Sequence, residues 1–241
     1  MARILLVAQE KGGVGKSLVA RGVAEAATGT AVLEIDSTQR LLELEDRVQF
    51  FSMRVERDEI ERTGGRAARA EFDPVINAIA SADRATLVDV GANTSRALLS
   101  VLRDVKQDLA ESNVEFGILV VVTAEPGAIS EAPRILELGR ELGATLFVVE
   151  NQIHGTIPKV NLKKIIGDAT LTSLREHAME AQAVTILQGT GLAAIPRLDA
   201  AKLNQAHGLA LGSRIRRDLT ALRADTMEAV RPAAEWLVSG K

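Results

Sequence analysis

A glycine-rich stretch near the start of the chain has the residue types and the spacing to bind phosphate. Residues 9–17, QEKGGVGKS, follow an apolar run and precede a segment of helical composition, which places them at a strand-to-helix turn. Glycines let the backbone N–H groups point inward at an anion, assisted by the positive end of the following helix. We expect Lys16 to reach the β- and γ-phosphates and the Ser17 hydroxyl to bind Mg²⁺. The candidate nucleotide-binding residues of this stretch are Gly12, Gly13, Val14, Gly15, Lys16, Ser17 and Leu18.

Two aspartates stand at the ends of later apolar runs. Asp36 ends the run at residues 31–36, and Asp89 lies near the end of the run at 85–92. Ligands of open parallel sheets bind outside the carboxyl ends of the strands, so both carboxylates are expected to face the glycine-rich stretch. Asp89 can hold a water of the Mg²⁺ shell, and Gly91 can bring a backbone N–H close to a γ-phosphate. Asp36 has an alternative role as the N-cap of a short helix. The candidate metal residues are Ser17, Asp36 and Asp89.

The elements that position these residues alternate between strand and helix along the chain. This order predicts an α/β fold: a doubly wound, mostly parallel sheet with right-handed crossovers and helices on both faces. The region between residues 151 and 180 is expected to be a surface helix, and Pro232 to start a short tail. Strands are expected at 4–8, 31–36, 49–55, 85–92, 116–123 (the central one), 145–150, 183–188 and 193–197, and helices at 18–27, 66–82, 94–111, 127–142 and over the last third.

Composition sets limits on size, compartment and chemistry. A chain of 241 residues is expected to form a single domain over 1–241, with a helical C-terminal part from about 200. The absence of cysteine excludes disulfides, thiolate catalysis and cysteine-bound metal clusters. No apolar run reaches the ~20 residues that span a bilayer, which predicts a cytoplasmic protein with membrane binding unlikely.

Charge patterning offers one candidate surface for nucleic acid. The formal net charge of −3 argues against a protein that coats DNA with its whole surface, and aromatic residues for base stacking are scarce. A charge-rich stretch at 56–69 is expected to be a solvated face. A basic helix face in the last third is the candidate for non-specific DNA contact, with a solvated face as the alternative; it carries Arg214, Arg216, Arg217 and Arg223.

The glycine-rich stretch resembles the deviant Walker A motif of the ParA/MinD family of dimerising P-loop ATPases, a SIMIBI-type group. Glu10 stands where the ordinary motif has its first glycine, and Lys11 matches the family's extra lysine. The resemblance implies a slow, Mg²⁺-dependent ATPase with ATP as its nucleotide, a homodimer around ATP, and an activating partner protein. It implies that Lys11 reaches the partner's nucleotide and that Asp36 orients the attacking water, so the candidate catalytic residues are Lys11, Lys16 and Asp36.

Further positions follow from the same resemblance. Asp89 is similar to the Walker B carboxylate, and Asn151 and Pro196 are expected near the adenine. The family usually ends its second strand Asp-x-Asp-Pro, whereas residues 34–37 are EIDS, which leaves open a slip of two residues. The stretches at 89–92 and 149–152 are similar to the plasmid-stability and conjugation branch, TraL/StbB-like proteins.

Three functions stay open from the sequence. The first is an ATPase switch that positions or partitions plasmid DNA or other cargo. The second is an ATP-dependent accessory protein of conjugation or plasmid stability that acts through protein partners. The third is a small-molecule kinase or ligase of the dethiobiotin-synthetase type, against which Lys11 stands.

Overall fold

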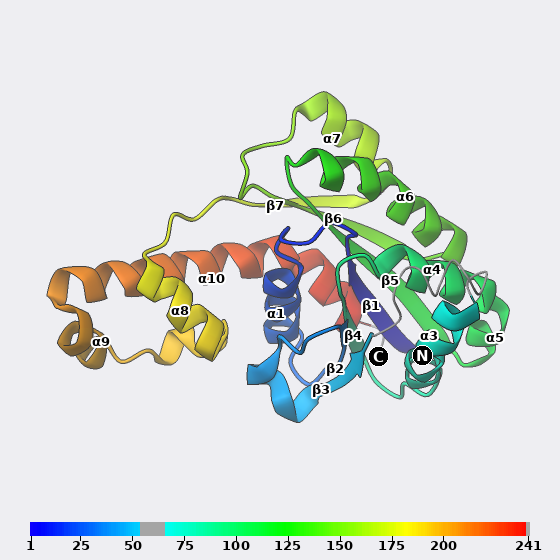
Figure 1. Cartoon of the computed structure of the whole chain (residues 1–241), viewed down its shortest axis with the longest axis horizontal. Helices are drawn as coiled ribbons and strands as arrows, with labels where there is room; N and C mark the ends of the chain where they lie inside the picture. The colour runs from blue at the N-terminus through cyan, green and yellow to red at the C-terminus, as the bar shows by residue number, and fades with distance from the viewer. Residues whose placement is uncertain (54–65, 240–241) are drawn as a thin grey trace.

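A seven-stranded sheet runs through the molecule in the order β3-β2-β4-β1-β5-β6-β7, and every neighbouring pair is parallel (Figure 1). The computed structural model describes residues 1–53 and 66–239. Strand order reverses at β1, so a crevice forms at the carboxyl end of that strand. The strands are β1 (Ala2–Ala8), β2 (Ala31–Asp36), β3 (Val48–Ser52), β4 (Thr86–Val90), β5 (Val114–Val122), β6 (Thr145–Asn151) and β7 (Thr170–Leu174).

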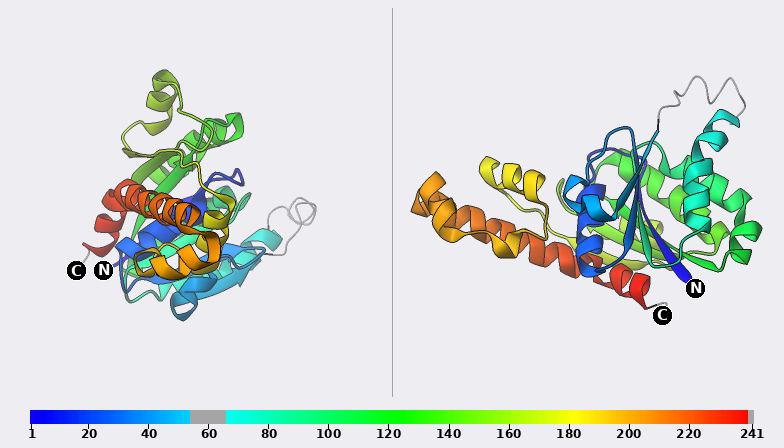
Figure 2. Two further views of the ribbon diagram at one scale, coloured as in Figure 1. Left: turned by 90° about the vertical axis from the view of Figure 1, so that its left-hand side faces the viewer. Right: turned by 90° about the horizontal axis from the view of Figure 1, so that it is seen from below.

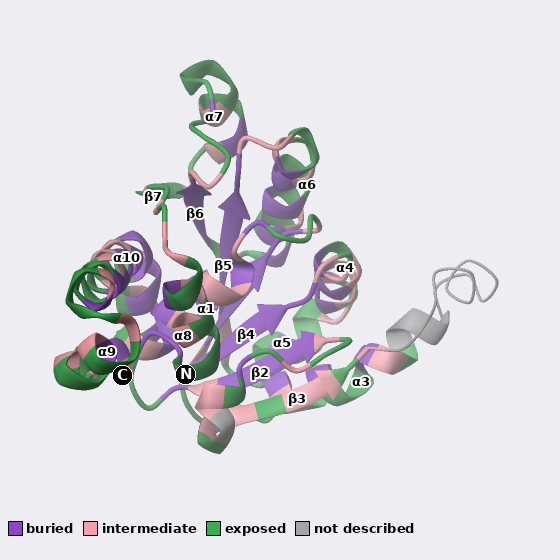
Figure 3. Cartoon of the chain, turned by 60° about the vertical axis from the view of Figure 1, so that its left-hand side comes forward, coloured by how far each residue is buried: buried purple, intermediate pink, exposed green. Residues whose placement is uncertain are grey.

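Helices cover both faces of the sheet and bury two separate cores (Figure 3). One face packs against α3 (Arg66–Ala80), α4 (Ser95–Asp104), α5 (Lys106–Glu111), α6 (Pro126–Leu142) and α7 (Lys159–Ile166). The other packs against α1 (Lys16–Ala26) and α10 (Leu209–Val238). Successive residues of β1 alternate between the two cores, which is why its sequence is apolar throughout.

A helical arm projects from the sheet at the N-terminal end of α10 (Figure 2). It consists of α8 (Ala181–Thr190), η2 (Ile195–Arg197), α9 (Ala200–His207) and the first half of α10. These pieces enclose a third small core with Leu18 of α1 packed against it. The buried members of this core are Ala183, Leu192, Ile195, Leu203, Ile215 and Leu219.

The predicted fold class is confirmed, and β2 has the bounds expected from the sequence. Several expected elements were wrong. Residues 183–188 belong to α8, and 193–197 contain the 3₁₀ helix η2, because short apolar runs have no period that separates helix from strand. The stretch at 151–180 was expected to be a surface helix. It contains the helix α7, but it also contains the strand β7, which was not expected.

Two further corrections concern position within elements. The central strand is β1, and the strand expected at the centre, 116–123, is its neighbour β5. Pro232 lies inside α10, which continues to Val238, so it does not start a tail. The expectation of a solvated face at residues 56–69 falls on side chains outside the described part of the chain.

The contact between α1 and α10 depends on Gly22. A Cβ atom there would lie 2.7 Å from Thr226 Cγ2 and 3.3 Å from Val230 Cγ1. We expect Gly22→Val to lower the free energy of unfolding by about 1–3 kcal/mol through overpacking, measured by urea denaturation. The control is Gly189→Ala on α8, where a Cβ meets nothing within 4 Å and helix propensity is expected to add up to about 1 kcal/mol. An unchanged urea midpoint for Gly22→Val would contradict this close packing of α1 on α10.

Candidate nucleotide site

The glycine-rich loop joins β1 to α1 and has the conformation that its glycines allow. Gly13 and Gly15 have φ values of 79° and 94°, in the left-handed region that side chains rarely adopt. A Cβ at Gly15 would also clash with Asn151 Nδ2. Helix α1 begins at Lys16 directly after Gly15, so the unpaired N–H groups of its first turn lie at the loop.

The loop, Asp36 and Asp89 meet in one cleft of about 250 Å³. Most of the predicted site residues line it, and Arg40, which the sequence did not single out, lines it with them. Val14 is buried instead, and its carbonyl accepts a hydrogen bond of 2.9 Å from Asn151 Nδ2 behind the loop. Pro196 is exposed on η2 in the helical arm. The cleft is lined by Gly12, Gly13, Gly15, Lys16, Ser17, Leu18, Asp36, Arg40, Asp89, Val90 and Ala92.

Lys16 is a cation held largely out of water. Its residue is 8% exposed, and its Nζ donates to the Lys11 carbonyl oxygen at 3.3 Å. Burial lowers the pKa of the Lys16 amine, while the charges of Asp89 and Asp36 oppose that change. An anion in the cleft would stabilise the protonated amine, so the site suits a phosphate group.

Asp89 and Ser17 form an oxygen-donor pair beside Lys16. Asp89 is 5% exposed, and burial raises the pKa of its carboxyl to about 6, against the opposing effects of the Ser17 hydrogen bond and the Lys16 charge. Hydroxyl and carboxylate oxygens are the ligands that Mg²⁺ prefers. In the described part of the chain, no group of three or more His, Cys, Asp or Glu residues could hold a metal. Mg²⁺ is commonly held by one or two protein oxygens together with phosphate oxygens and water, and Ser17 and Asp89 fit such a site.

Asp36 faces the same cleft with few bonds of its own. Its Oδ1 accepts from the Ser37 N–H at 2.6 Å, and its Oδ2 lies 3.0 Å from Arg40 Nε. These contacts are to residues one and four positions along the chain, before η1 (Leu42–Arg47) begins. Asp36 is therefore not the N-cap of that helix, which was its alternative role. The carboxylate is placed to meet a ligand in the cleft.

The role expected for Gly91 is wrong. Its N–H donates to the Ile35 carbonyl oxygen at 2.6 Å, so it is not free for a phosphate. A Cβ at Gly91 would lie 2.8 Å from that oxygen and 3.0 Å from Asp36 Cγ. Gly91 thus lets the ends of β2 and β4 approach each other and keeps Asp36 and Asp89 in one cleft.

Gln9 fixes the start of the loop, a role that the sequence did not reveal. Its side chain is fully buried, and its Nε2 donates to the carbonyl oxygens of Val121 at 3.0 Å and Ala128 at 3.2 Å. Its Oε1 accepts from the Glu10 N–H at 2.9 Å. One amide therefore holds the loop against β5 and α6. The available signal was a polar residue directly after a buried strand.

Glu10 joins the loop to α4. Its Oε1 accepts from the Arg96 N–H at 2.6 Å, in the first turn of that helix, and its carbonyl oxygen accepts from the Asn93 N–H at 3.0 Å. A carboxylate at a helix N-terminus satisfies an unpaired donor and interacts favourably with the helix dipole. Glu10, the residue that departs from the ordinary motif, is therefore bonded to the first turn of α4.

Glu34 fixes the segment after β2. It is 1% exposed, and its Oε1 accepts from the backbone N–H groups of Arg40 at 2.5 Å and Leu41 at 3.3 Å. Burial raises the pKa of the Glu34 carboxyl, and these two hydrogen bonds oppose that rise. The segment that carries Arg40 is therefore held at the edge of the cleft.

Lys11 lies outside the cleft. Its side chain is 46% exposed, and its Nζ is 4.0 Å from Glu125 Oε1 at the start of α6. The same oxygen is 3.9 Å from His154 Nε2. The two lysines of the loop thus differ in surroundings: Lys16 faces the cleft and Lys11 extends away from it.

The basic face of α10 is partly neutralised within the chain. Arg214 Nε donates to Glu180 Oε1 at 2.9 Å, Arg217 Nε to Asp218 Oδ1 at 3.1 Å, and Arg223 pairs with Glu25 of α1. Arg216 is exposed. A DNA phosphate at this face would compete with existing carboxylate partners at three of the four arginines.

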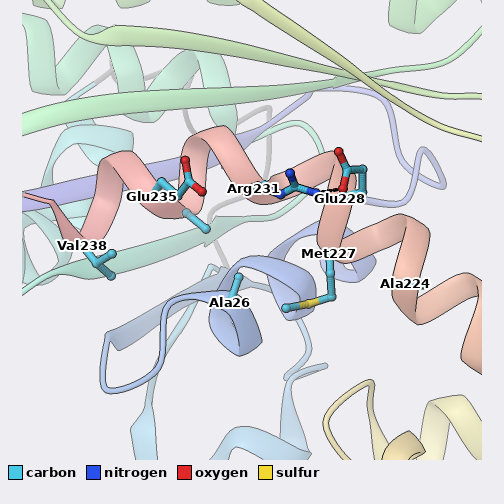
Figure 4. Close-up of a pocket in the computed structure, with 8 residues that line it drawn as sticks. Ala26, Ala224, Met227, Glu228, Arg231, Glu235 and Val238 are labelled. Atoms are coloured by element: carbon cyan, nitrogen blue, oxygen red, sulfur yellow. Dashed lines mark ion pairs between the residues drawn. The ribbon is translucent and has the colours of Figure 1, made fainter.

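A second groove of about 350 Å³ lies between the C-terminal end of α1 and α10, at the opposite end of α1 from the loop (Figure 4). Ala26, Met227 and Val238 give it apolar walls, and an ion pair joins Glu228 to Arg231.

Among the described helices, none is long and apolar enough to cross a membrane.

No protein-family model and no curated protein matches the chain. Solved structures similar to it include the MinD cell division protein of Aquifex aeolicus, with 18% identity and a TM-score of 0.46 over 91% of this chain and 98% of that one. An ATP complex of a Cyanothece McdA variant has 14% identity and a TM-score of 0.44 over 91% and 96%. A putative plasmid partition protein of Borrelia burgdorferi, bound to AMPPNP, has 14% identity and a TM-score of 0.43 over 91% and 98%. The fold of this chain is established by the strand order and the two cores described above.

Proposed function

We propose that the chain is a Mg²⁺-dependent ATPase switch that dimerises around ATP, hydrolyses it slowly, and positions plasmid DNA or other cellular cargo. The observation that carries this proposal is the separation of the two loop lysines. Lys16 lines the cleft of its own chain, whereas Lys11 is exposed beyond it. An ordinary phosphate loop needs only the first of these cations.

The chain's own groups supply what phosphoryl transfer requires, which is positioning and charge stabilisation. Loop N–H groups and Lys16 hold the phosphates, and Ser17 with Asp89 would hold the metal. Bound Mg²⁺ would neutralise charge on the phosphate oxygens. Asp36 accepts a hydrogen bond from the attacking water and orients it toward the γ-phosphate.

The direction of the Lys11 side chain supports the proposed dimer. Its side chain runs beside Gly127 to Glu125 at the start of α6, where a Cβ at Gly127 would lie 3.6 Å from Lys11 Cδ. An ion pair between groups exposed to this degree is weak, so Lys11 can leave it at little cost. A second copy that faces the cleft would place its nucleotide within reach of this amine, and a partner protein would then stimulate hydrolysis.

Lys11→Ala tests the proposal. We expect the wild type to be a dimer with Mg²⁺ and AMPPNP and a monomer with ADP, by light scattering after gel filtration. The variant is expected to stay a monomer with either nucleotide and to lose at least about tenfold in hydrolysis, because a charge-assisted contact to phosphate is missing. Lys163→Ala, which removes an exposed lysine on α7, is the matched control. A Lys11→Ala variant with unchanged dimerisation and hydrolysis would refute the proposal.

A further inference from the structure

A second cation lines the cleft beside Lys16. Arg40 lies between β2 and η1, and it is one of the cleft-lining residues described above. Its charge is close enough to Lys16 to contribute to lowering the pKa of the lysine amine. Two positive side chains at one small cleft suit a ligand with several negative charges.

The backbone of Arg40 is fixed from two sides while its side chain stays exposed. Glu34 accepts its N–H from the sheet side. Its carbonyl oxygen accepts from Arg21 Nη2 of α1 at 2.7 Å, and Arg21 also pairs with Glu43 of η1. The Arg40 side chain is 57% exposed. The chain therefore anchors the base of a long cationic side chain at the rim and leaves its head free to change partners.

The present partner of that head is Asp36, through one contact of 3.0 Å between Nε and Oδ2. Ion pairs with this exposure are weak. A phosphate group offers a guanidinium two parallel charge-assisted hydrogen bonds, a stronger arrangement than this single one. Phosphate oxygens in the cleft can therefore displace Asp36 from Arg40.

We propose that Arg40 binds the terminal phosphate of a nucleoside triphosphate in its own subunit and is the residue that distinguishes a triphosphate from a diphosphate. The inference rests on the ATPase function proposed above. With a diphosphate in the cleft, Arg40 stays paired with Asp36. With a triphosphate, Arg40 transfers to the γ-phosphate oxygens, and the Asp36 carboxylate is released to accept a hydrogen bond from water.

The test compares AMPPNP and ADP binding by calorimetry in the presence of Mg²⁺. Arg40→Ala is expected to weaken AMPPNP binding by about tenfold or more, and ADP binding by less than about twofold, because only the triphosphate reaches the guanidinium. Arg40→Lys keeps the charge without the planar fork and is expected to fall between wild type and Arg40→Ala. Circular dichroism and thermal unfolding without nucleotide establish that both variants are folded.

Two matched variants separate phosphate contact from other roles. Arg134→Ala removes an arginine of similar exposure, paired with Glu131 on α6, and is expected to change neither affinity. Asp36→Ala removes the present partner of Arg40 and is expected to keep AMPPNP affinity. If Arg40 acts only by positioning Asp36, Arg40→Ala will likewise keep AMPPNP affinity and lose hydrolysis, and the inference is overturned.

The remaining outcomes also decide the question. Equal weakening of AMPPNP and ADP, or no weakening of either, would overturn the role of Arg40 and leave the proposed ATPase intact. A wild-type chain that bound neither nucleotide would overturn both together.

Discussion

Replacing Lys16 with alanine is expected to remove most nucleotide binding and nearly all hydrolysis. The amine is buried in the cleft with its pKa lowered by burial, so it interacts with phosphate in surroundings where charge is poorly screened. We expect affinity for ATP to fall by roughly tenfold to a hundredfold, and hydrolysis by about 10²–10³-fold.

Thermal unfolding with and without nucleotide measures the loss of binding in Lys16→Ala, since a ligand that binds only the folded state raises the melting temperature. Lys106→Ala is the matched control, because Lys106 Nζ also donates to a backbone carbonyl, that of Glu141 at 2.9 Å, but is exposed on α5. A variant without Lys16 that was stabilised by ATP as strongly as the wild type would show that the cleft is not the nucleotide site.

Asp36→Ala is expected to separate binding from hydrolysis. The backbone around Asp36 is held by Glu34 and by the Gly91 N–H, so the cleft keeps its shape without the carboxylate. ATP binding should persist, while hydrolysis falls by about a hundredfold or more as the water loses its orienting group. The variant should therefore accumulate as a dimer with ATP itself.

The measurement for Asp36→Ala is phosphate release in parallel with light scattering. Asp46→Ala, at an exposed aspartate on η1, is the control and should behave as the wild type. Loss of nucleotide binding in Asp36→Ala would instead assign the carboxylate a structural role.

Local patterns predicted the sheet well where strands are buried on both faces. β2 and β6 are mostly apolar runs with polar residues toward their carboxyl ends, and their bounds match those expected from the sequence to within one residue. β7 has the sequence TLTSL and lies at the sheet edge, mostly exposed, so it has no apolar signal to detect. α8 contains β-branched residues and becomes helical in an arm whose core depends on α10, far along the chain.

The same contrast applies to the candidate site, where a local sequence pattern identified some residues and long-range contacts position the others. The glycine-rich loop is contiguous in sequence, so its residues could be named from their order alone. A hydrogen bond across a turn fixes Arg40 relative to Glu34. The Gln9 side chain is fixed by hydrogen bonds to carbonyl groups more than a hundred residues away in the sequence. Gly91 was singled out correctly as unusual but assigned the wrong reason, because its close neighbour is the end of β2.

The bond between Glu10 and α4 has a consequence for protein engineering. Glycine at position 10 would restore the commonest form of the loop motif, and a consensus-based redesign would choose it. That edit would take away the acceptor of the Arg96 N–H and leave the start of α4 without its carboxylate. The residue that matches the common motif is therefore expected to be less stabilising at position 10 than the glutamate that is present.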